Sequence, residues 1–173
     1  PLSGVVCLHG KTGSELLANA LKRAKLERRV MLELPGFLGL AAIVASTDLL
    51  ATLNTGTNLL LQANNDIVIN EALLANNPAG NGGRLTLQAG RSIRFNANVT
   101  TDSGDLLATA NSTLAAGVVD QYRDPGNAEL FIAPGVTLDA GTGTITLTID
   151  DGAGLTNRGA GGISLGNLVA DTI

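Results

Sequence analysis

The sequence NLLLQANNDIVIN, residues Asn58–Asn70, recurs one interval later as RLTLQAGRSIRFN, residues Arg84–Asn96. Aligned position by position, the two copies share the pairs Leu59/Leu85, Leu61/Leu87, Gln62/Gln88, Ala63/Ala89, Ile67/Ile93 and Asn70/Asn96. In each copy, apolar residues alternate with polar ones on both sides of a polar corner, which predicts a strand, a tight corner and a second strand. Repetition at an interval of roughly 20 to 50 residues is typical of stacked units that share one core. The sequence therefore predicts an all-β fold, a parallel β-helix (β-solenoid).

The composition agrees with a narrow, stacked core. The chain has 173 residues, with 22 Gly, no Trp, one Tyr and three Phe. A globular core of this size usually contains more aromatic side chains, because they bury the largest apolar area per residue. The interior of a β-helix is instead filled by Leu, Ile, Val and Ala, which are abundant here.

Charge divides the chain into two parts. Residues 1–46 carry a net charge of about +3, whereas residues 47–173 contain no Lys and carry about −7. We expect a helical or irregular N-terminal segment over residues 1–40 and β-helix repeats over 41–173. An acidic main part with few aromatic residues is not a nucleic-acid surface, which needs a basic stripe to neutralise phosphates. The single cysteine, Cys7, excludes an internal disulfide.

The N-terminal segment has helix signals and one near-motif. Thr12–Glu15 forms a capping box, and Leu17, Leu21 and Ala24 follow at helical spacing, which predicts a helix that ends before Pro35. GVVCLHGKT, residues 4–12, approaches a phosphate-binding loop around Lys11, but its glycines are one residue too far apart. A capped helix after a turn is the favoured interpretation, and nucleotide binding is the weaker alternative.

An apolar run also lies close to the start of the repeats. FLGLAAIVA, residues 37–45, is too short to cross a bilayer, which takes about 20 residues, so no transmembrane segment is predicted. Ser46 is a candidate N-cap for a short helix over Thr47–Leu53, with Leu49, Leu50 and Leu53 facing inward.

Less regular copies follow the first two. The sequence predicts a third coil from GDLLATANSTLAAGVV, an excursion over Asp120–Ala128, a fourth coil from AELFIAPGVTLDAG and a fifth from GTITLTIDDGAGLTN. In the fourth, the expected inward residues are Leu130, Ile132, Val136 and Leu138; in the fifth, Ile145, Leu147 and Ile149. The last residues, GGISLGNLVADTI, begin another strand pair and stop within the pattern. We therefore expect an open end and a fragment of a longer solenoid.

Candidate binding residues lie at outward-facing positions of the strands and in the excursion. Arg84 and Arg94 point outward, and Arg91 lies in the corner between the two strands of its copy. Together they predict an exposed cationic region suited to an anionic surface sugar, although exposed charge on strands also serves solvation and edge protection. Tyr122, the single tyrosine, lies in the excursion, where binding residues often gather; a solvent-exposed corner is the plainer interpretation.

Other polar sets give weaker signals. Asp102 and Asp105 with Arg94, or the pair Asp150 and Asp151, are the candidate carboxylates for a catalytic site. Cys7 and His9 are too few ligands for zinc, and no metal or cofactor site is predicted. The outward Thr144, Thr146 and Thr148 suggest an ice-binding ladder, but Leu60 interrupts the array. Asn98 and Asn111 begin glycosylation sequons.

The repeats resemble a known family. The runs STDLLATLNTGTNLLLQANNDIVIN, GNGGRLTLQAGRSIRFNANVTTDSGDL, GVTLDAGTGTITLTIDDGAGLTN and ISLGNL are similar to the repeat region of filamentous-haemagglutinin-type exoproteins, the secreted partners of two-partner secretion systems. The resemblance covers about residues 41–173. Neither an Asn-Pro-Asn-Gly nor an Asn-Pro-Asn-Leu signature of that family's secretion domain is present, and Asn77–Gly80 is a partial match.

The resemblance implies a right-handed parallel β-helix that is exported through an outer-membrane β-barrel transporter. It implies a secreted protein at the bacterial cell surface, an adhesin or toxin-presenting stalk, with a host or cell-surface glycan or protein as partner. It supplies no catalytic residues. We therefore expect a non-catalytic structural or adhesive segment with Arg84, Arg91, Arg94 and Tyr122 as its candidate adhesive surface. The alternative is a carbohydrate-active β-helix enzyme, a polysaccharide lyase or hydrolase.

Overall fold

The computed structural model describes residues 42–43 and 46–173. The predicted helix after Thr12, the Lys11 motif and most of the apolar run that precedes Ser46 lie outside these residues. In the described part, the strands form three sheets in which every pairing is parallel. The prediction of an all-β, parallel fold is confirmed.

The three sheets are named here by the order in which the chain visits them. Sheet I consists of β2 (Leu59–Ala63), β5 (Leu85–Ala89), β8 (Leu106–Ala110) and β11 (Ile145–Ile149). Sheet II consists of β1 (Ala42–Ile43), β3 (Ile67–Ile69), β6 (Ile93–Phe95), β9 (Ala128–Ile132) and β12 (Ala160–Ser164). Sheet III consists of β4 (Leu73–Leu74), β7 (Val99–Thr100), β10 (Thr137–Asp139) and β13 (Asn167–Val169).

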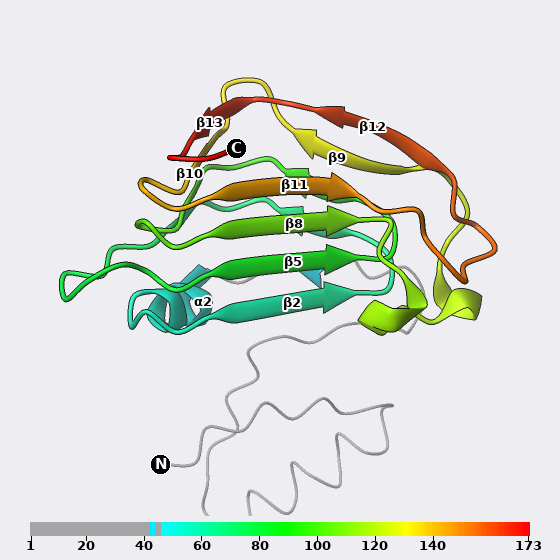
Figure 1. Ribbon diagram of the computed structural model, residues 1–173, viewed down its shortest axis with the longest axis horizontal. Helices are drawn as coiled ribbons and strands as arrows, with labels where there is room; N and C mark the ends of the chain where they lie inside the picture. Colours follow the sequence, from blue (N-terminus) through cyan, green and yellow to red (C-terminus); the bar gives the residue numbers. More distant parts are fainter. Residues whose placement is uncertain (1–41, 44–45) are drawn as a thin grey trace, which may run out of the picture. The chain divides into compact units, whose positions relative to one another are not determined.

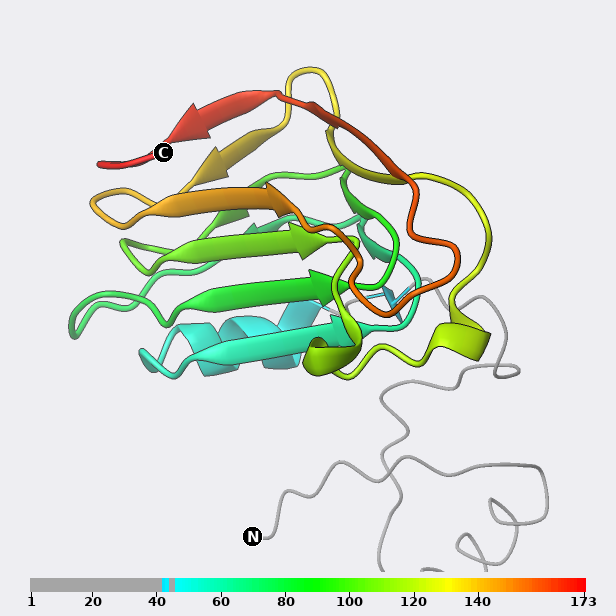
Figure 2. The same cartoon turned by 45° about the vertical axis from the view of Figure 1, so that its right-hand side comes forward.

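From β2 onward the chain adds one strand to sheet I, one to sheet II and one to sheet III, and then returns to sheet I beside the strand it left (Figure 1). We call each such set of three strands a level. Level 1 is β2–β3–β4, level 2 is β5–β6–β7, level 3 is β8–β9–β10 and level 4 is β11–β12–β13. The turned view in Figure 2 shows the strands of sheet I lying one above another.

The register between levels 1 and 2 is the one that the repeat predicts. Leu59 pairs with Leu85 and Ala63 with Ala89 in sheet I, and Ile67 pairs with Ile93 in sheet II. Outside the core, Gln62 donates a hydrogen bond to Gln88 at 2.8 Å. Identical polar side chains therefore stack on the outside while identical apolar ones stack within.

The predicted third and fourth coils are wrong as separate units. β8 pairs with β5 in sheet I, but β9, the strand within AELFIAPGVTLDAG, pairs with β6 in sheet II. Leu130 accordingly stacks on Ile93, whereas Leu106 stacks on Leu85. One level holds both segments, because residues 111–127 separate its first two strands, whereas three residues separate the corresponding strands in levels 1 and 2. The predicted fifth coil supplies only β11 of level 4, and the strand pair predicted in GGISLGNLVADTI corresponds to β12 and β13 of the same level.

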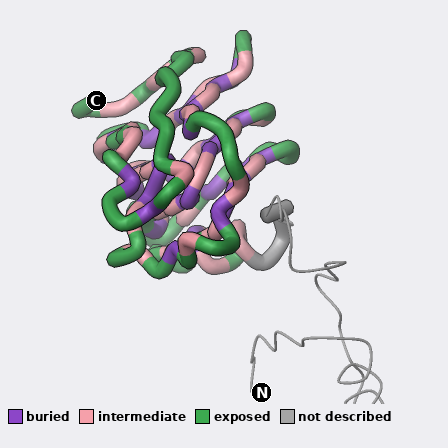
Figure 3. The backbone as a smooth tube through the Cα atoms, turned by 90° about the vertical axis from the view of Figure 1, so that its right-hand side faces the viewer, coloured by how far each residue is buried: buried purple, intermediate pink, exposed green. Residues whose placement is uncertain are grey.

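The core lies between the three sheets and follows the alternation of the strands. In β5, β8 and β9 the first, third and fifth residues are buried and the second and fourth are partly exposed. Figure 3 shows this alternation of burial along the backbone. Leu85, Ile93, Phe95, Val99 and Leu130 are fully buried. The core needs few aromatic side chains because facing strands in a narrow stack are filled by aliphatic ones, as the composition suggests.

Helix α2 (Ser46–Leu53) precedes level 1 and confirms the predicted short helix. Leu53 is fully buried in the core and Leu50 packs against it. The end of the core next to β2 therefore carries a helix, which Figure 2 shows beside that strand. Neither this helix nor the short 3₁₀ helices of residues 46–173 are long and apolar enough to cross a membrane.

Glycine residues stack in one corner, where sheet III returns to sheet I. A Cβ atom built on Gly104 would lie 2.3 Å from the carbonyl oxygen of Gly83. One on Gly143 would lie 2.8 Å from the carbonyl oxygen of Gly104, and one on Gly83 would lie 1.9 Å from that of Thr57. The backbones of successive levels approach too closely at this corner for any side chain, so only glycine fits.

Candidate functional site

The most elaborate surface of the described chain is the excursion of residues 111–127, which connects β8 to β9. It contains the short helices η1 (Leu114–Ala116) and η2 (Asp120–Tyr122), which Figure 1 shows near the end of β2. The segment extends beyond the predicted Asp120–Ala128. Its start was missed because LAAGVV continues the apolar pattern of a strand.

Two asparagines of level 1 fix the excursion to the corner between sheets I and II. The side chain of Asn64 donates to the carbonyl oxygen of Val119 at 3.2 Å and accepts from the Val119 amide at 2.7 Å. Asn65, which is 6% exposed, donates to the carbonyl oxygen of Tyr122 and accepts from the amide of Asp124. The amide side chain of asparagine contains both a donor and an acceptor. It can therefore bind N–H and C=O groups of the excursion that do not pair with a neighbouring strand.

Arg91 and Asp66 join levels 1 and 2 at the same corner. Arg91 donates from Nε to Asp66 Oδ1 at 2.8 Å and from Nη2 to Oδ2 at 2.5 Å, which is bidentate pairing. The Ser92 amide donates to the same carboxylate, and Arg91 Nη1 donates to the carbonyl oxygen of Pro125 in the excursion. Arg91, which the sequence assigned to a candidate adhesive surface, therefore ties two levels and the excursion together.

The surroundings of Asp66 set its pKa. Burial opposes ionisation, but the hydrogen bonds from Arg91 and from the Ser92 amide, with the nearby positive charges, outweigh burial, so the pKa of Asp66 lies below its ordinary value. The pairing raises the pKa of Arg91. Because the folded pKa of Asp66 is depressed, its stabilising contribution is present above pH 4 or so and is lost as the pH falls through the folded pKa.

We expect Asp66→Asn to lower the free energy of unfolding at pH 7 by about 1–3 kcal/mol, since Arg91 would lose its charged partner in a half-buried corner. The loss of stability on acidification below pH 4 should be smaller in this variant than in the wild type. Urea unfolding at pH 7 and pH 3, followed by circular dichroism, measures both. Glu129→Gln, in a more exposed ion pair, should change stability by about 0–1 kcal/mol. Equal losses in the two variants would contradict the structural role of Asp66.

Arg94 lies on the outward face of sheet II, as predicted. Its Nη2 donates to Glu129 Oε1 across the pairing of β6 with β9, and its guanidinium carbon lies 5.5 Å from the centre of the Phe131 ring. The Arg94 and Glu129 side chains are 43% and 39% exposed, respectively. Arg94 also lies near enough to Asp66 to help lower the pKa of that carboxyl group. Arg91 and Arg94 therefore belong to one surface.

Arg84 does not join this surface. It precedes β5 whereas Arg91 follows it, so the length of the strand, about 17 Å, separates them. Its Nε lies 3.5 Å from Asp105 Oδ2. Each of the three predicted cations thus has an acidic partner from another level, and the surface they were expected to make positive is close to neutral.

Tyr122 is 37% exposed at the end of η2, next to the segment that Asn65 holds. The excursion also exposes Leu114 and Val119, each 43% accessible. The structure therefore places the backbone of Tyr122 and the Arg91 side chain at the corner between sheets I and II, and Arg94 on the adjoining outward face of sheet II. We call these residues, with Glu129 and Phe131, the corner surface.

Arg123 is a buried residue of the excursion that the sequence pattern did not single out. It is 2% exposed, and its Nη2 donates to Asn111 Oδ1 at 3.3 Å while Nη1 donates to the carbonyl oxygens of Asp124 and Gly126. Its Nε is buried without a hydrogen-bond acceptor. Burial lowers the pKa of Arg123, as does the neighbouring Arg91, but arginine remains protonated at neutral pH. Nothing in DQYRDPGNA distinguishes a buried arginine from an exposed one.

Asn111 extends this buried network towards level 4. Its Nδ2 donates to the carbonyl oxygens of Asp150 and Arg158, and the residue is fully buried. The second predicted sequon therefore begins at an asparagine whose amide is already used inside the fold. Asn98, in the first sequon, is exposed and accepts a hydrogen bond from the Thr137 amide.

The candidate catalytic carboxylates accept hydrogen bonds from backbone amides of the turns between strands. Asp102 accepts from the Asn77 amide, and Asp105 accepts from the Thr144 amide while pairing with Arg84. Asp150 accepts from the Asp151 amide, and Asp151 from the Ala153 amide. Arg94 lies on sheet II with Glu129, away from the corner of Asp102. Among the residues that the structure describes, no three His, Cys, Asp or Glu side chains gather as a metal site.

No protein-family model matches the chain, and no curated protein or solved structure has significant similarity to it.

Proposed function

We propose that this chain is a non-catalytic segment of a large secreted bacterial surface protein, a right-handed parallel β-helix of the filamentous-haemagglutinin type that acts as an adhesive scaffold. The observation that supports it best is the register, which repeats from level to level with apolar residues inside and polar ones outside. A stack of this kind can be lengthened by one level at a time without changing its cross-section, as a surface stalk requires. Export through an outer-membrane β-barrel transporter is part of the same proposal and follows from the sequence resemblance.

The corner surface is the proposed adhesive region. It combines side chains that form hydrogen bonds, Arg94 and Glu129, with two aromatic rings, Tyr122 and Phe131, on a framework held by partly buried hydrogen bonds. Binding residues gather on loops that a rigid scaffold positions. Because each cation is already paired with an acid, an anionic sugar would have to compete with that acid. A neutral cell-surface glycan, recognised through its hydroxyl groups, fits this surface better.

The test compares two arginines that differ mainly in position. Binding of the labelled chain to a panel of cell-surface glycans should weaken about tenfold in Arg94→Gln, as expected when a residue that contributes more than 1 kcal/mol is lost. Arg84→Gln should bind within about twofold of the wild type, since Arg84 lies beyond the far end of β5 and is similarly exposed. Equal binding by both variants, or equal loss, would contradict the assignment of the corner surface.

A further inference from the structure

The excursion contains the single Asp–Pro bond of the chain, between Asp124 and Pro125. An Asp–Pro bond breaks more readily than other peptide bonds for two reasons. The aspartate carboxylate can reach its own carbonyl carbon and close a five-membered ring. The proline nitrogen carries no hydrogen in the chain and is more basic than other amide nitrogens, so it leaves readily once it is protonated. The surroundings of the bond decide how fast these groups react.

A buried cation binds the carbonyl oxygen of this bond. Arg123, which is 2% exposed, donates from Nη1 to the carbonyl oxygen of Asp124 and, at 3.2 Å, to that of Gly126. Because water is excluded there, negative charge that develops on the Asp124 oxygen is stabilised more by the guanidinium than it would be in solution. This is the arrangement of an oxyanion hole, in which a fixed donor faces the oxygen where charge develops.

The carboxylate of Asp124 is available as the nucleophile. Asp102 and Asp151 each use the side chain to accept a hydrogen bond from a backbone amide. The partly buried Asp124 side chain accepts none from the residues that the structure describes. Its charge interacts with the guanidinium groups of Arg91 and Arg123, so two cations lie near the reacting residue.

The backbone on both sides of the bond is fixed. The Asp124 amide donates to Asn65 Oδ1 at 2.6 Å, and Arg91 Nη1 donates to the carbonyl oxygen of Pro125 at 3.1 Å. Asn65 belongs to the corner of level 1 and Arg91 to that of level 2, so two levels of the core hold the bond. A nucleophile and a target that are already held together lose less freedom on reaching the transition state, which raises the rate.

We propose that the folded chain cleaves its own Asp124–Pro125 bond. A carboxylate oxygen of Asp124 attacks the carbonyl carbon of the same residue, and Arg123 stabilises the oxyanion that forms. The Pro125 nitrogen takes a proton from a water molecule as the C–N bond breaks, which gives a cyclic anhydride at Asp124. The remaining hydroxide opens the anhydride, so Asp124 ends with a free α-carboxyl group beside its side-chain carboxyl group. One water molecule is consumed, and no oxidant or reductant is needed.

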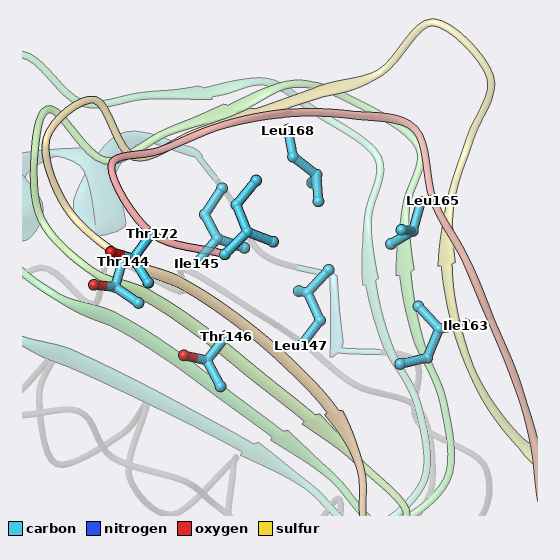
Figure 4. Close-up of a pocket in the computed structure, with 9 residues that line it drawn as sticks. Thr144, Ile145, Thr146, Leu147, Ile163, Leu165, Leu168 and Thr172 are labelled. Carbon is cyan, nitrogen blue, oxygen red and sulfur yellow. The ribbon is translucent and has the colours of Figure 1, made fainter.

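The cleaved chain should stay assembled. Residues 1–124 contain β8, which pairs with β5 and also with β11 of the other fragment. Residues 125–173 contain β9, which pairs with β6 of the first fragment. The second fragment also has apolar contacts of its own, since Figure 4 shows Ile145, Leu147 and Leu168 converging from β11 and β13. Cleavage therefore interrupts the covalent chain while the strand pairing persists, and denaturation separates the fragments.

Incubation of the full 173-residue chain tests the proposal. At about pH 5 an ordinary aspartate is ionised, and protons for the leaving nitrogen are more plentiful than at neutrality. The folded chain should release fragments of residues 1–124 and 125–173 at least about tenfold faster than the same chain in concentrated urea. Denaturing electrophoresis measures the rate, and mass spectrometry identifies Asp124 and Pro125 as the new chain ends.

Variants separate the role of the carboxylate from that of the cation. Asp124→Glu keeps the charge but closes only a larger ring, which forms more slowly, so cleavage should fall at least about tenfold. Arg123→Gln removes the donor and should slow cleavage on the order of a hundredfold, as the loss of one oxyanion-hole donor does. Asp171→Glu, at an exposed aspartate that threonine follows, should cleave as the wild type does. Circular dichroism reports whether each variant folds, and if Arg123→Gln unfolds, the Asp124→Glu comparison decides.

Any of four results would overturn the proposal. The first is a folded chain that is cleaved no faster than the unfolded chain. The second is wild-type cleavage in Asp124→Glu, and the third is a set of fragments that end elsewhere than at Asp124. The fourth is a folded Arg123→Gln variant with the wild-type rate. None of these results bears on glycan binding by the corner surface, so the two proposals succeed or fail separately.

Discussion

Replacing Phe95 with alanine is expected to lower the free energy of unfolding by about 3–5 kcal/mol. Phe95 is fully buried in level 2, in register with Ile69 on one side and Ile132 on the other. Its ring is the largest side chain of the core, and the levels above and below are held by backbone hydrogen bonds that prevent them from closing on the cavity. The variant loses the free energy gained by removing the ring from water. It also leaves a cavity in the core, which costs further stability.

Phe131→Ala is the matched control, because Phe131 lies one strand away on the outward face of the same sheet. It contacts the Arg94 guanidinium and is only partly buried, so its loss should cost about 1 kcal/mol. Urea unfolding of both variants, monitored by circular dichroism, measures the two values. Similar losses for the two phenylalanines would mean that the inward and outward faces of sheet II are wrongly assigned.

Gly104→Ala is expected to destabilise the fold by about 3 kcal/mol, the upper end of the usual range for inserting an atom into a packed site. The new Cβ would lie 2.3 Å from the carbonyl oxygen of Gly83 and 2.7 Å from that of Gly82. Both neighbours are backbone atoms of the level below, so neither can rotate away as a side chain would. The two levels would have to separate at this corner.

Gly80→Ala provides the comparison, since a Cβ there would meet no atom within 4 Å. Its stability should equal or slightly exceed that of the wild type, because alanine restricts the unfolded chain more than glycine does. Thermal and urea unfolding of the two variants distinguish the outcomes. If Gly104→Ala were as stable as Gly80→Ala, the close approach of the levels at the glycine corner would be refuted.

The arrangement of strands within the first two levels was predictable from the sequence. Side chains on a strand alternate with a period of two, so a repeat that preserves Leu59, Leu61 and Ile67 at fixed spacing also preserves their register. The alternation of side chains did not predict level 3, which the sequence pattern divided into two coils. The excursion inserts residues 111–127 between two strands of one level, and LAAGVV within it has the same apolar character as a strand.

The candidate site was predicted only in part. The outward positions of Arg84 and Arg94 followed from strand parity, but their acidic partners did not. Arg91 pairs with Asp66 across 25 residues, and Arg94 with Glu129 across 35. Such pairs are set by which residues become neighbours when levels stack, so a local pattern cannot reveal them. The burial of Arg123 depends in the same way on Asn111 and on the path of the excursion.

The asparagines that hold the excursion also bear on the order in which the chain assembles. Levels 1 and 2 meet across 26 residues, as Gln62 and Gln88 do, whereas Asn64 meets Val119 across 55 residues. The larger loop costs only about 0.7 kcal/mol more in closure entropy, so entropy alone barely separates the two events. Geometry does separate the pairing of levels 1 and 2 from the binding of the excursion. The backbone groups that Asn64 and Asn65 bind lie in the excursion, which is in place only after β8 has formed. During folding, levels 1 and 2 can pair through short-range contacts while these two side chains remain hydrated, and the corner becomes rigid only after the third level forms.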